Sequence, residues 1–169
     1  LKAERVFIYR FNPDWSGFVV AESVLPGLPS CLKIKVTDTY FAGSNPGIEE
    51  YKNGRICVND DIYAANLSDC HLKLLEQFAI KANLIAPILQ NNQLFALIVA
   101  NQCSQPRTWE KHEVDLFVQL AKQVGFAVEQ ASLLEQQKSD VERSQLLIEI
   151  THHICQSLSL EDLFTTTVK

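Results

Sequence analysis

The sequence ANLIAPILQNNQLFALIVAN, residues 82–101, carries the strongest signal of secondary structure in this chain. It contains two apolar runs, residues 82–89 and 94–101, which have the length of strands and are far short of the roughly 20 residues that a membrane span needs. The four residues between the runs, Gln90-Asn91-Asn92-Gln93, are all polar. The stretch therefore predicts an antiparallel β-hairpin with a tight turn.

The beginning of the chain predicts a second hairpin. Residues 6–10 alternate in polarity and are rich in β-forming side chains, and residues 18–24 have the same character. The segment between them, residues 12–17, contains Pro13 and Gly17, which favour a turn because proline restricts φ and glycine permits positive φ. These two strands are expected to join the same sheet.

The region after the first hairpin has little regular pattern. Pro26-Gly27-Leu28-Pro29 ends the second strand, and residues 32–36 have the composition of a short extended segment. Residues 37–59 predict irregular structure around Gly43-Ser44-Asn45-Pro46-Gly47. Long irregular segments in compact domains are usually functional or disordered, so this region is a candidate for ligand binding.

Two helices are expected, one short and one long. Residues 69–78 carry leucines at helical spacing, and from Trp109 onward apolar residues recur at steps of three and four. Thr108 is the expected N-cap of the long helix. The long pattern fits either a signalling helix that continues beyond the domain or one packed helix followed by a solvated linker. The order of elements predicts an α+β fold with an antiparallel sheet flanked by helices.

Composition narrows the function classes. The chain has 169 residues, of which 47% are hydrophobic and 21% charged, so one globular domain with additional helix is expected. The formal net charge of −5 and the scattered basic residues argue against a nucleic-acid surface. No segment is long enough for a membrane span and no signal peptide is present, which predicts a cytoplasmic protein without membrane contact. The five cysteines form no CxxC pair, so no metal site is expected.

Four sequence blocks, in this order, resemble the cyanobacteriochrome GAF family, the small bilin-binding relatives of phytochromes. The blocks are Arg5-Val6-Phe7-Ile8-Tyr9-Arg10-Phe11 with Asp14-Trp15-Ser16-Gly17, Gly54-Arg55 with Asp60-Asp61-Ile62-Tyr63, Cys70-His71-Leu72 with Leu75-Glu76-Gln77-Phe78, and Lys81-Ala82-Asn83-Leu84-Ile85-Ala86-Pro87-Ile88. The resemblance implies a bilin-binding GAF domain at residues 1–135, with its first helix missing. It also implies that residues 136–169 form a helical linker and the start of a further GAF repeat.

The resemblance implies that Cys70 carries phycocyanobilin or a related linear tetrapyrrole through a thioether. His71 would then lie under the pyrrole rings, where an imidazole offers a donor or acceptor to their nitrogens. From the residues alone, Cys70 could instead be a buried structural cysteine and His71 an exposed helical histidine. The pair is not expected to bind a metal, because adjacent residues on a helix diverge by about 100°.

Asp38 stands where the family places a carboxylate against the ring nitrogens, and a buried cationic tetrapyrrole needs such an anion. Asp38 could instead cap or turn the loop. Phe41 follows in the same block. One branch of the family has a second cysteine at the position of Tyr40, so this departure favours intact conjugation and green-to-red absorption. Cys31 or Cys57 could supply a substitute thiol.

The remaining candidates for contact with the tetrapyrrole come from the loop and the strands. Tyr51, Lys52 and Arg55 could pair with propionate groups or be solvated. Tyr63 is expected either near the chromophore or in the core. Two candidates lie on the central hairpin: Asn83 and Asn101, the latter standing where the family often has His or Tyr.

The function implied by the resemblance is photoreception, in which bilin isomerisation switches the domain between two visible-absorbing states. The alternative is a chromophore-free GAF domain that binds a small ligand or mediates dimerisation. No catalytic motif is recognisable, so the domain is not expected to be an enzyme, although the full-length protein could carry a histidine kinase or another output. The expected partners are adjacent GAF or output domains of the same chain and a second copy bound through the long helix.

Overall fold

The computed structural model describes residues 1–36 and 46–166, and the side-chain environments of residues 1–34 and 47–154. The chain divides into two units, Leu1–Val128 and Glu129–Lys169. Asp38, Tyr40 and Phe41 lie outside the described residues, so their expected roles remain predictions.

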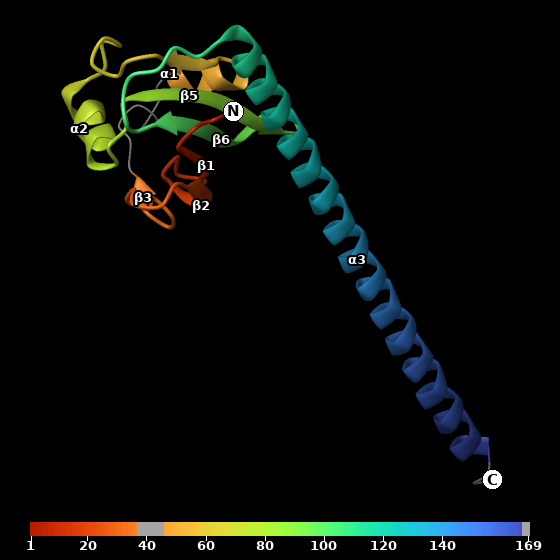
Figure 1. The fold of residues 1–169 in the computed structure, drawn as a ribbon. Helices are drawn as coiled ribbons and strands as arrows, with labels where there is room; N and C mark the ends of the chain where they lie inside the picture. The colour runs from red at the N-terminus through yellow and green to blue at the C-terminus, as the bar shows by residue number, and fades with distance from the viewer. Residues whose placement is uncertain (37–45, 167–169) are drawn as a thin grey trace. The chain divides into compact units, whose positions relative to one another are not determined.

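The first unit is built on one antiparallel sheet (Figure 1). Among the described residues it has six strands in the order β3-β2-β1-β6-β5-β4. The strands are β1 (Arg5–Phe11), β2 (Gly17–Val24), β3 (Lys35–Val36), β4 (Cys57–Asn59), β5 (Ala82–Gln90) and β6 (Gln93–Gln102). The two predicted hairpins are confirmed as β1–β2 and β5–β6, and they meet in the middle of the sheet, where β1 pairs with β6. The α+β prediction is therefore correct.

The turn between β5 and β6 consists of two residues, since Gln90 pairs with Gln93. Asn91 and Asn92 both have positive φ, at 50° and 58°. Two consecutive residues with positive φ are typical of a type I′ turn, whose twist matches that of the flanking strands. Asparagine tolerates this conformation better than most other residues, so the polar Asn-Asn pair determines the register of the hairpin.

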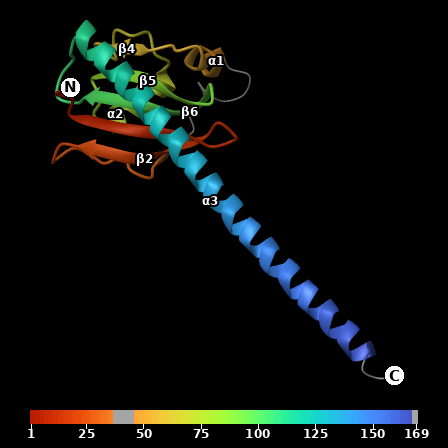
Figure 2. The same ribbon diagram turned by 90° about the vertical axis from the view of Figure 1, so that its right-hand side faces the viewer.

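One face of the sheet is covered by the beginning of α3 (Lys111–Thr166) (Figure 2). Phe117 and Ala121 of this helix are 1% exposed and pack against a row of small residues on β5 and β6, namely Ala82, Ala86, Ala96 and Ala100. Alanine side chains permit a helix to approach a sheet closely, since they occupy little space above the strands. This packing leaves the opposite face of the sheet for the other helices and loops.

Residues 37–59 contain more regular structure than predicted. The described part includes α1 (Pro46–Lys52) and the edge strand β4, whereas the sequence predicted irregular structure throughout. The helix has only seven residues, too few to show a periodic pattern, and it is stabilised by burial of Ile48 and Tyr51 in the core. β4 has only three residues and owes its conformation to pairing with β5.

The expected N-cap of the long helix is wrong. α3 begins at Lys111, three residues after Thr108. Glu110 holds the helix start instead, because its carbonyl accepts from the Val114 amide and its own amide donates to the Glu113 carboxylate at 3.2 Å. The preceding segment is bound to Asp60, whose carboxylate accepts from the Trp109 amide at 3.0 Å.

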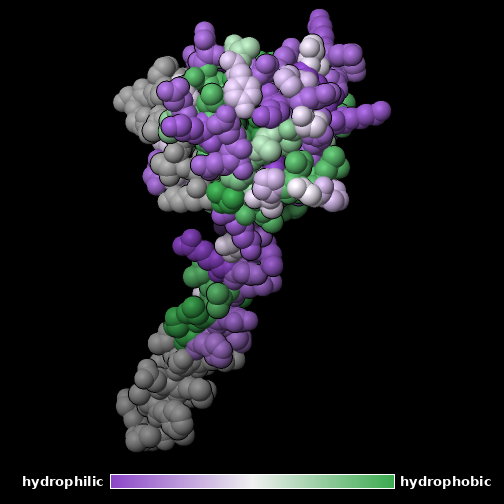
Figure 3. All heavy atoms as spheres, turned by 60° about the vertical axis from the view of Figure 1, so that its left-hand side comes forward, coloured by the Kyte–Doolittle hydropathy of each residue, from purple (hydrophilic) through white to green (hydrophobic). Residues whose placement is uncertain are grey.

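The second unit contains the remaining part of α3, and its side chains from residue 130 to residue 154 are exposed. Apolar side chains gather along one side of this helix and hydrophilic ones along the other (Figure 3). Large exposed apolar residues in it are Leu133, Leu134, Val141, Leu146, Leu147, Ile148, Ile150 and Ile154. In the part of the chain that the structure describes, no helix combines the length and apolar character needed to cross a membrane.

Gly125 on α3 provides a test of the helix–sheet packing. A Cβ atom at this position would lie 2.5 Å from the Leu89 carbonyl oxygen, which belongs to the backbone and cannot rotate away. We expect Gly125→Ala to lower the free energy of unfolding by about 1–3 kcal/mol, as overpacking usually does. Helix propensity alone would favour alanine by about 0.8–1.0 kcal/mol. The sign of the change in unfolding free energy therefore distinguishes the close contact from the propensity effect.

Chemical denaturation measures this effect, with the exposed Gln123→Ala on the same helix as the control. The control should change stability by no more than about 0.5 kcal/mol. Stabilisation by Gly125→Ala would contradict the close contact between α3 and the β5–β6 hairpin.

Candidate functional site

The face of the sheet opposite α3 forms the floor of a cavity of about 390 Å³. Alternation along the strands separates the two faces: Leu84 and Ile98 pack under α3, whereas Ile85, Leu97 and Val99 line the cavity. The walls come from α1, α2 (Asp69–Gln77), residues 65–68 and the segment that follows β2. The lining is mainly apolar with a few polar groups, which is typical of a small-molecule site.

α2 brings the predicted Cys70-His71 pair to the edge of this cavity. Ser68 caps the helix, since its hydroxyl accepts from the His71 amide at 3.3 Å. The imidazole of His71 is half-buried and lines the cavity. The thiol of Cys70 is free and exposed, and it does not belong to the cavity lining. The interpretation of Cys70 as a buried structural cysteine is therefore wrong.

A row of three asparagines crosses the cavity floor. Asn59 on β4, Asn83 on β5 and Asn101 on β6 are paired in register, and all three line the cavity. Asn59 donates from its Nδ2 to Asn83 Oδ1 at 2.8 Å. Asn101 is 0% exposed, and neither its Oδ1 nor its Nδ2 has a hydrogen-bond partner among the described residues. A buried amide in this state carries an uncompensated desolvation cost, which a ligand that both donates and accepts would remove.

The three predicted propionate partners are not equivalent. Tyr51 is 4% exposed and lines the cavity, and Arg55 also lines it, with its guanidinium carbon 5.9 Å from the centre of the Tyr51 ring. Arg55 forms an ion pair with Glu50 at the surface. Lys52 lies outside the lining, where its ammonium group contacts Glu49 at 2.8 Å and lies 5.9 Å from the centre of the Trp15 ring. The structure therefore brings Tyr51 and Arg55 to the cavity but not Lys52.

One of the two expected positions of Tyr63, the core, is wrong, because this side chain is 51% exposed. Tyr63 is also absent from the cavity lining, and its expected position near the chromophore remains a prediction. Its hydroxyl donates to the Glu76 carboxylate at 3.2 Å and accepts from the Lys81 ammonium group at 3.0 Å. These two charged partners hold the phenol at the surface, so packing in the core is excluded.

Comparison with known proteins agrees with this geometry. The GAF domain profile matches residues 1–128. The chain belongs to the GAF domain family. It is 36% identical to the blue-light absorbing form of the Thermosynechococcus elongatus PixJ GAF domain, with a TM-score of 0.78 and 83% of each chain covered. It is 38% identical to the red-light absorbing state of NpR6012g4, a red/green cyanobacteriochrome, with a TM-score of 0.71 over 79% of this chain and 87% of that one. These matches identify it as a cyanobacteriochrome GAF domain.

A curated relative indicates the kind of protein in which such domains occur. The chain is 48% identical over 147 residues to a putative methyl-accepting chemotaxis protein of Synechocystis, sll0041. The match covers 86% of this chain but only 14% of that protein. The chain therefore spans about one seventh of the length of that relative.

Two further thiols line the cavity of this GAF domain. Burial raises the pKa of the Cys31 thiol to about 12, with Arg5 opposing and Glu22 reinforcing that shift. Burial also raises the pKa of Cys57, although Arg55, Asn59 and Tyr51 oppose it. Both thiols are therefore protonated at neutral pH, and neither is activated as a nucleophile in this state.

Sequence reasoning missed several residues of the site. Ser68 carried a recognisable signal, since a serine before a helical pattern is a common N-cap. Asn59 lies in a three-residue strand that was not predicted, so its position in the asparagine row had no local signal. Arg5 was recognised only as part of a sequence block, yet it is 0% exposed at the cavity side of β1.

Asn101 provides a test of the site that needs no ligand. We expect Asn101→Leu to raise the free energy of unfolding of the ligand-free domain by about 1–2 kcal/mol, because it removes a buried amide that has no hydrogen-bond partner among the described residues. Denaturation by urea measures the change. The matched variant Asn83→Leu should instead lower stability, since it deprives the Asn59 amide of its acceptor. Destabilisation by both variants would show that the Asn101 amide is satisfied in the ligand-free protein.

Proposed function

We propose that this GAF domain is the sensory part of a photoreceptor and carries phycocyanobilin or a related linear tetrapyrrole on Cys70. The observation that supports it most directly is the position of the Cys70-His71 pair: an exposed free thiol is followed at once by a histidine that lines the cavity. The similarity to cyanobacteriochrome GAF domains favours the same ligand class. When bound, the tetrapyrrole would supply visible absorption and a double bond that isomerises in light.

The lining residues fit such a group. Phe7, Ile85 and Val99 offer apolar surface to a planar conjugated ligand, and His71 and Asn101 offer polar groups at separate places in the cavity. The Asn101 amide can pair with a group that has both N–H and C=O, such as the lactam at either end of a bilin. Arg55 and Tyr51 are suitable partners for carboxylate side chains.

The chain's own residues would perform three tasks in this proposal. Cys70 would hold the ligand covalently through Sγ, and the exposure of that thiol leaves it accessible. His71 would provide a donor or acceptor to ring nitrogens from α2. The apolar walls would exclude water, and a change in ligand shape would alter the packing of those walls and bias the rest of the protein. The domain itself would bind and signal without catalysing a reaction.

We further propose that adjacent GAF or output domains of the same chain receive the signal, as the multidomain relative suggests. The apolar side of the second unit is a candidate surface for a second copy, and residues 136–169 remain a candidate linker to a further GAF repeat. Tyr40 in place of the second cysteine favours absorption between green and red. A cytoplasmic location remains the expected one.

Covalent attachment is tested by co-expression with a phycocyanobilin-producing system. We expect a zinc-fluorescent band on a denaturing gel and reversible absorbance changes on illumination, both lost in Cys70→Ala. The matched control is Cys57→Ala, which removes a cavity-lining thiol and should retain the fluorescent band. Absence of covalent pigment from the unmodified protein would favour the alternative, a chromophore-free GAF domain for small-ligand binding or dimerisation.

The role of Asp38 is tested by titration of the loaded protein. A carboxylate beside the pyrrole nitrogens stabilises their protonated form, so removal of its charge should lower the pKa of the chromophore. Asp38→Asn is therefore expected to bleach or blue-shift the dark absorption band near neutral pH, and acidification should restore the band. An absorbance titration that is unchanged by the substitution would exclude Asp38 from this role.

A further inference from the structure

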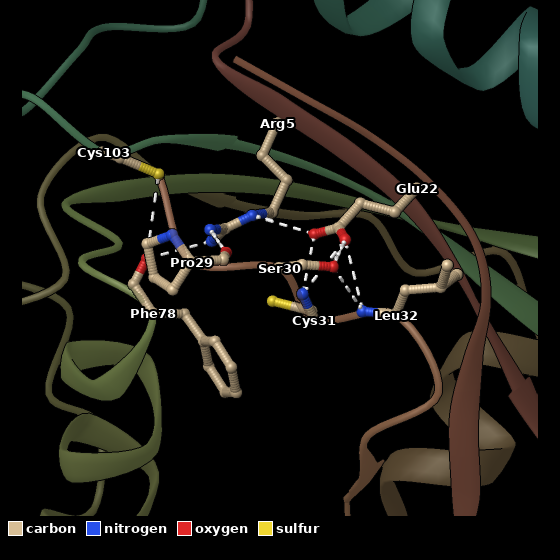
Figure 4. Close-up of polar contacts among 8 residues, drawn as sticks. All are labelled: Arg5, Glu22, Pro29, Ser30, Cys31, Leu32, Phe78 and Cys103. Atoms are coloured by element: carbon tan, nitrogen blue, oxygen red, sulfur yellow. Dashed lines mark hydrogen bonds and ion pairs between the residues drawn. The ribbon is translucent and has the colours of Figure 1, made fainter. Parts of the chain in front are cut away.

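A charged side chain is completely buried at the start of β1. Arg5 is 0% exposed, and burial of a guanidinium is costly unless each of its groups is paired. Figure 4 shows its partners: Arg5 Nε lies 3.2 Å from Glu22 Oε1, Nη1 donates to the Phe78 carbonyl at 2.9 Å, and Nη2 donates to the Pro29 carbonyl. One side chain on the sheet therefore contacts three separate segments.

The contact with Phe78 holds the end of α2. Phe78 is the C-cap of that helix, so its carbonyl has no donor within the helix. A cation at a helix C-terminus also interacts favourably with the helix dipole. Ser68 caps the other end of α2, and thus the nine-residue helix that carries Cys70 and His71 is held at both ends.

The contact with Glu22 holds a second wall. The Glu22 carboxylate is 3% exposed and accepts from the Cys31 amide at 2.9 Å, from the Leu32 amide at 3.2 Å and from the Ser30 hydroxyl. Burial disfavours ionisation of Glu22, but these bonds and the charge of Arg5 outweigh it and lower its pKa. The pair therefore stays charged at neutral pH. Glu22 thus connects Arg5 to the segment that contains Cys31.

Both segments line the cavity. His71, Leu75 and Phe78 belong to the wall formed by α2, and Cys31 belongs to the wall after β2. Arg5 also pairs in register with Asn101 on the cavity floor. We propose that Arg5 is a positioning residue, which sets the distance of α2 and the Cys31 segment from the floor and thereby presents Cys70 for ligand attachment. The attachment part of this inference rests on the proposed function.

The test uses a double variant, because removal of Arg5 alone would leave the Glu22 charge buried and unpaired. In Arg5→Met with Glu22→Gln, both charges are absent and the glutamine oxygen still accepts from the loop amides. The matched control is Arg10→Met, the same substitution at an exposed site on the same strand.

Hydrogen exchange distinguishes a local loss of protection in α2 from a general loss of stability of the domain. In the double variant we expect α2 amides to exchange at least about tenfold faster, as expected from loss of a charged hydrogen bond at the helix end. The amides of β5 and β6 should exchange as in the unmodified protein. Equal acceleration in α2 and in the central strands, or no acceleration in α2, would overturn the positioning role.

Pigment attachment provides the second readout. The initial rate of covalent phycocyanobilin attachment, per mole of folded protein, should fall about tenfold in the double variant, in line with the loss at α2, and stay unchanged in Arg10→Met. An unchanged rate in the double variant would overturn the inference that Arg5 presents Cys70. If the unmodified protein attaches no pigment, the proposed function fails, whereas the exchange result still decides whether Arg5 holds α2.

Arg5→Lys is the variant to use for the same exchange measurement if the double variant does not fold. Lysine keeps a charge opposite Glu22 but lacks the planar fork that reaches Phe78 and Pro29 together. The same selective acceleration in α2 is expected, and full protection of α2 in this variant would contradict a role for the guanidinium geometry.

Discussion

The antiparallel pairing of β5 with β6 determines which side chains meet α3 and which line the cavity. Because side chains alternate along both strands, one face presents alanines that admit α3 closely, and the other presents Ile85, Val99 and the asparagine row to the cavity. A shift of one residue in the register would exchange these faces. The Asn91-Asn92 turn, with positive φ at both residues, prevents that shift. The location of the cavity thus follows from the hairpin.

Two buried polar groups on the cavity side of the sheet, the Arg5 guanidinium and the Asn101 amide, differ in how many partners they have within the protein. The Arg5 guanidinium has partners on three segments and so connects the walls; Nη1 and Nη2 are hydrogen-bonded, and Nε is paired with Glu22 by charge, without a hydrogen bond among the described residues. The Asn101 amide, its neighbour across the strands, has no partner among the described residues. A compensated group stabilises the empty domain, whereas an uncompensated one lowers its stability and strengthens binding of a ligand that pairs with it. The floor of the cavity can therefore make a polar contact that the described residues do not make.

Much of the fold could be predicted from the sequence, because its main elements have local signals. Alternation and turn residues predicted both hairpins, and leucine spacing predicted α2. The helix α1 and the strand β4 were missed, since seven and three residues carry no period and are regular only through contacts with the core and with β5. The site was predictable in part: His71, Tyr51, Arg55, Asn83 and Asn101 do line the cavity, but Tyr63 does not. The roles of Arg5 and Glu22 had no local signal, because Arg5 meets Phe78 across 73 positions of sequence.

We propose that the linear tetrapyrrole attached to Cys70 lies in the cavity on the face of the sheet opposite α3. The most direct measurement is a nitrogen-15 resolved NMR spectrum of the asparagine side-chain amides before and after loading with phycocyanobilin. We expect a large shift of the Asn101 amide signals and shifts of the neighbouring Asn59 and Asn83 signals, with little change for Asn53, which lies outside the lining. Covalently bound pigment with unchanged Asn101 signals would contradict this position of the ligand, because the ligand would then lie outside the cavity.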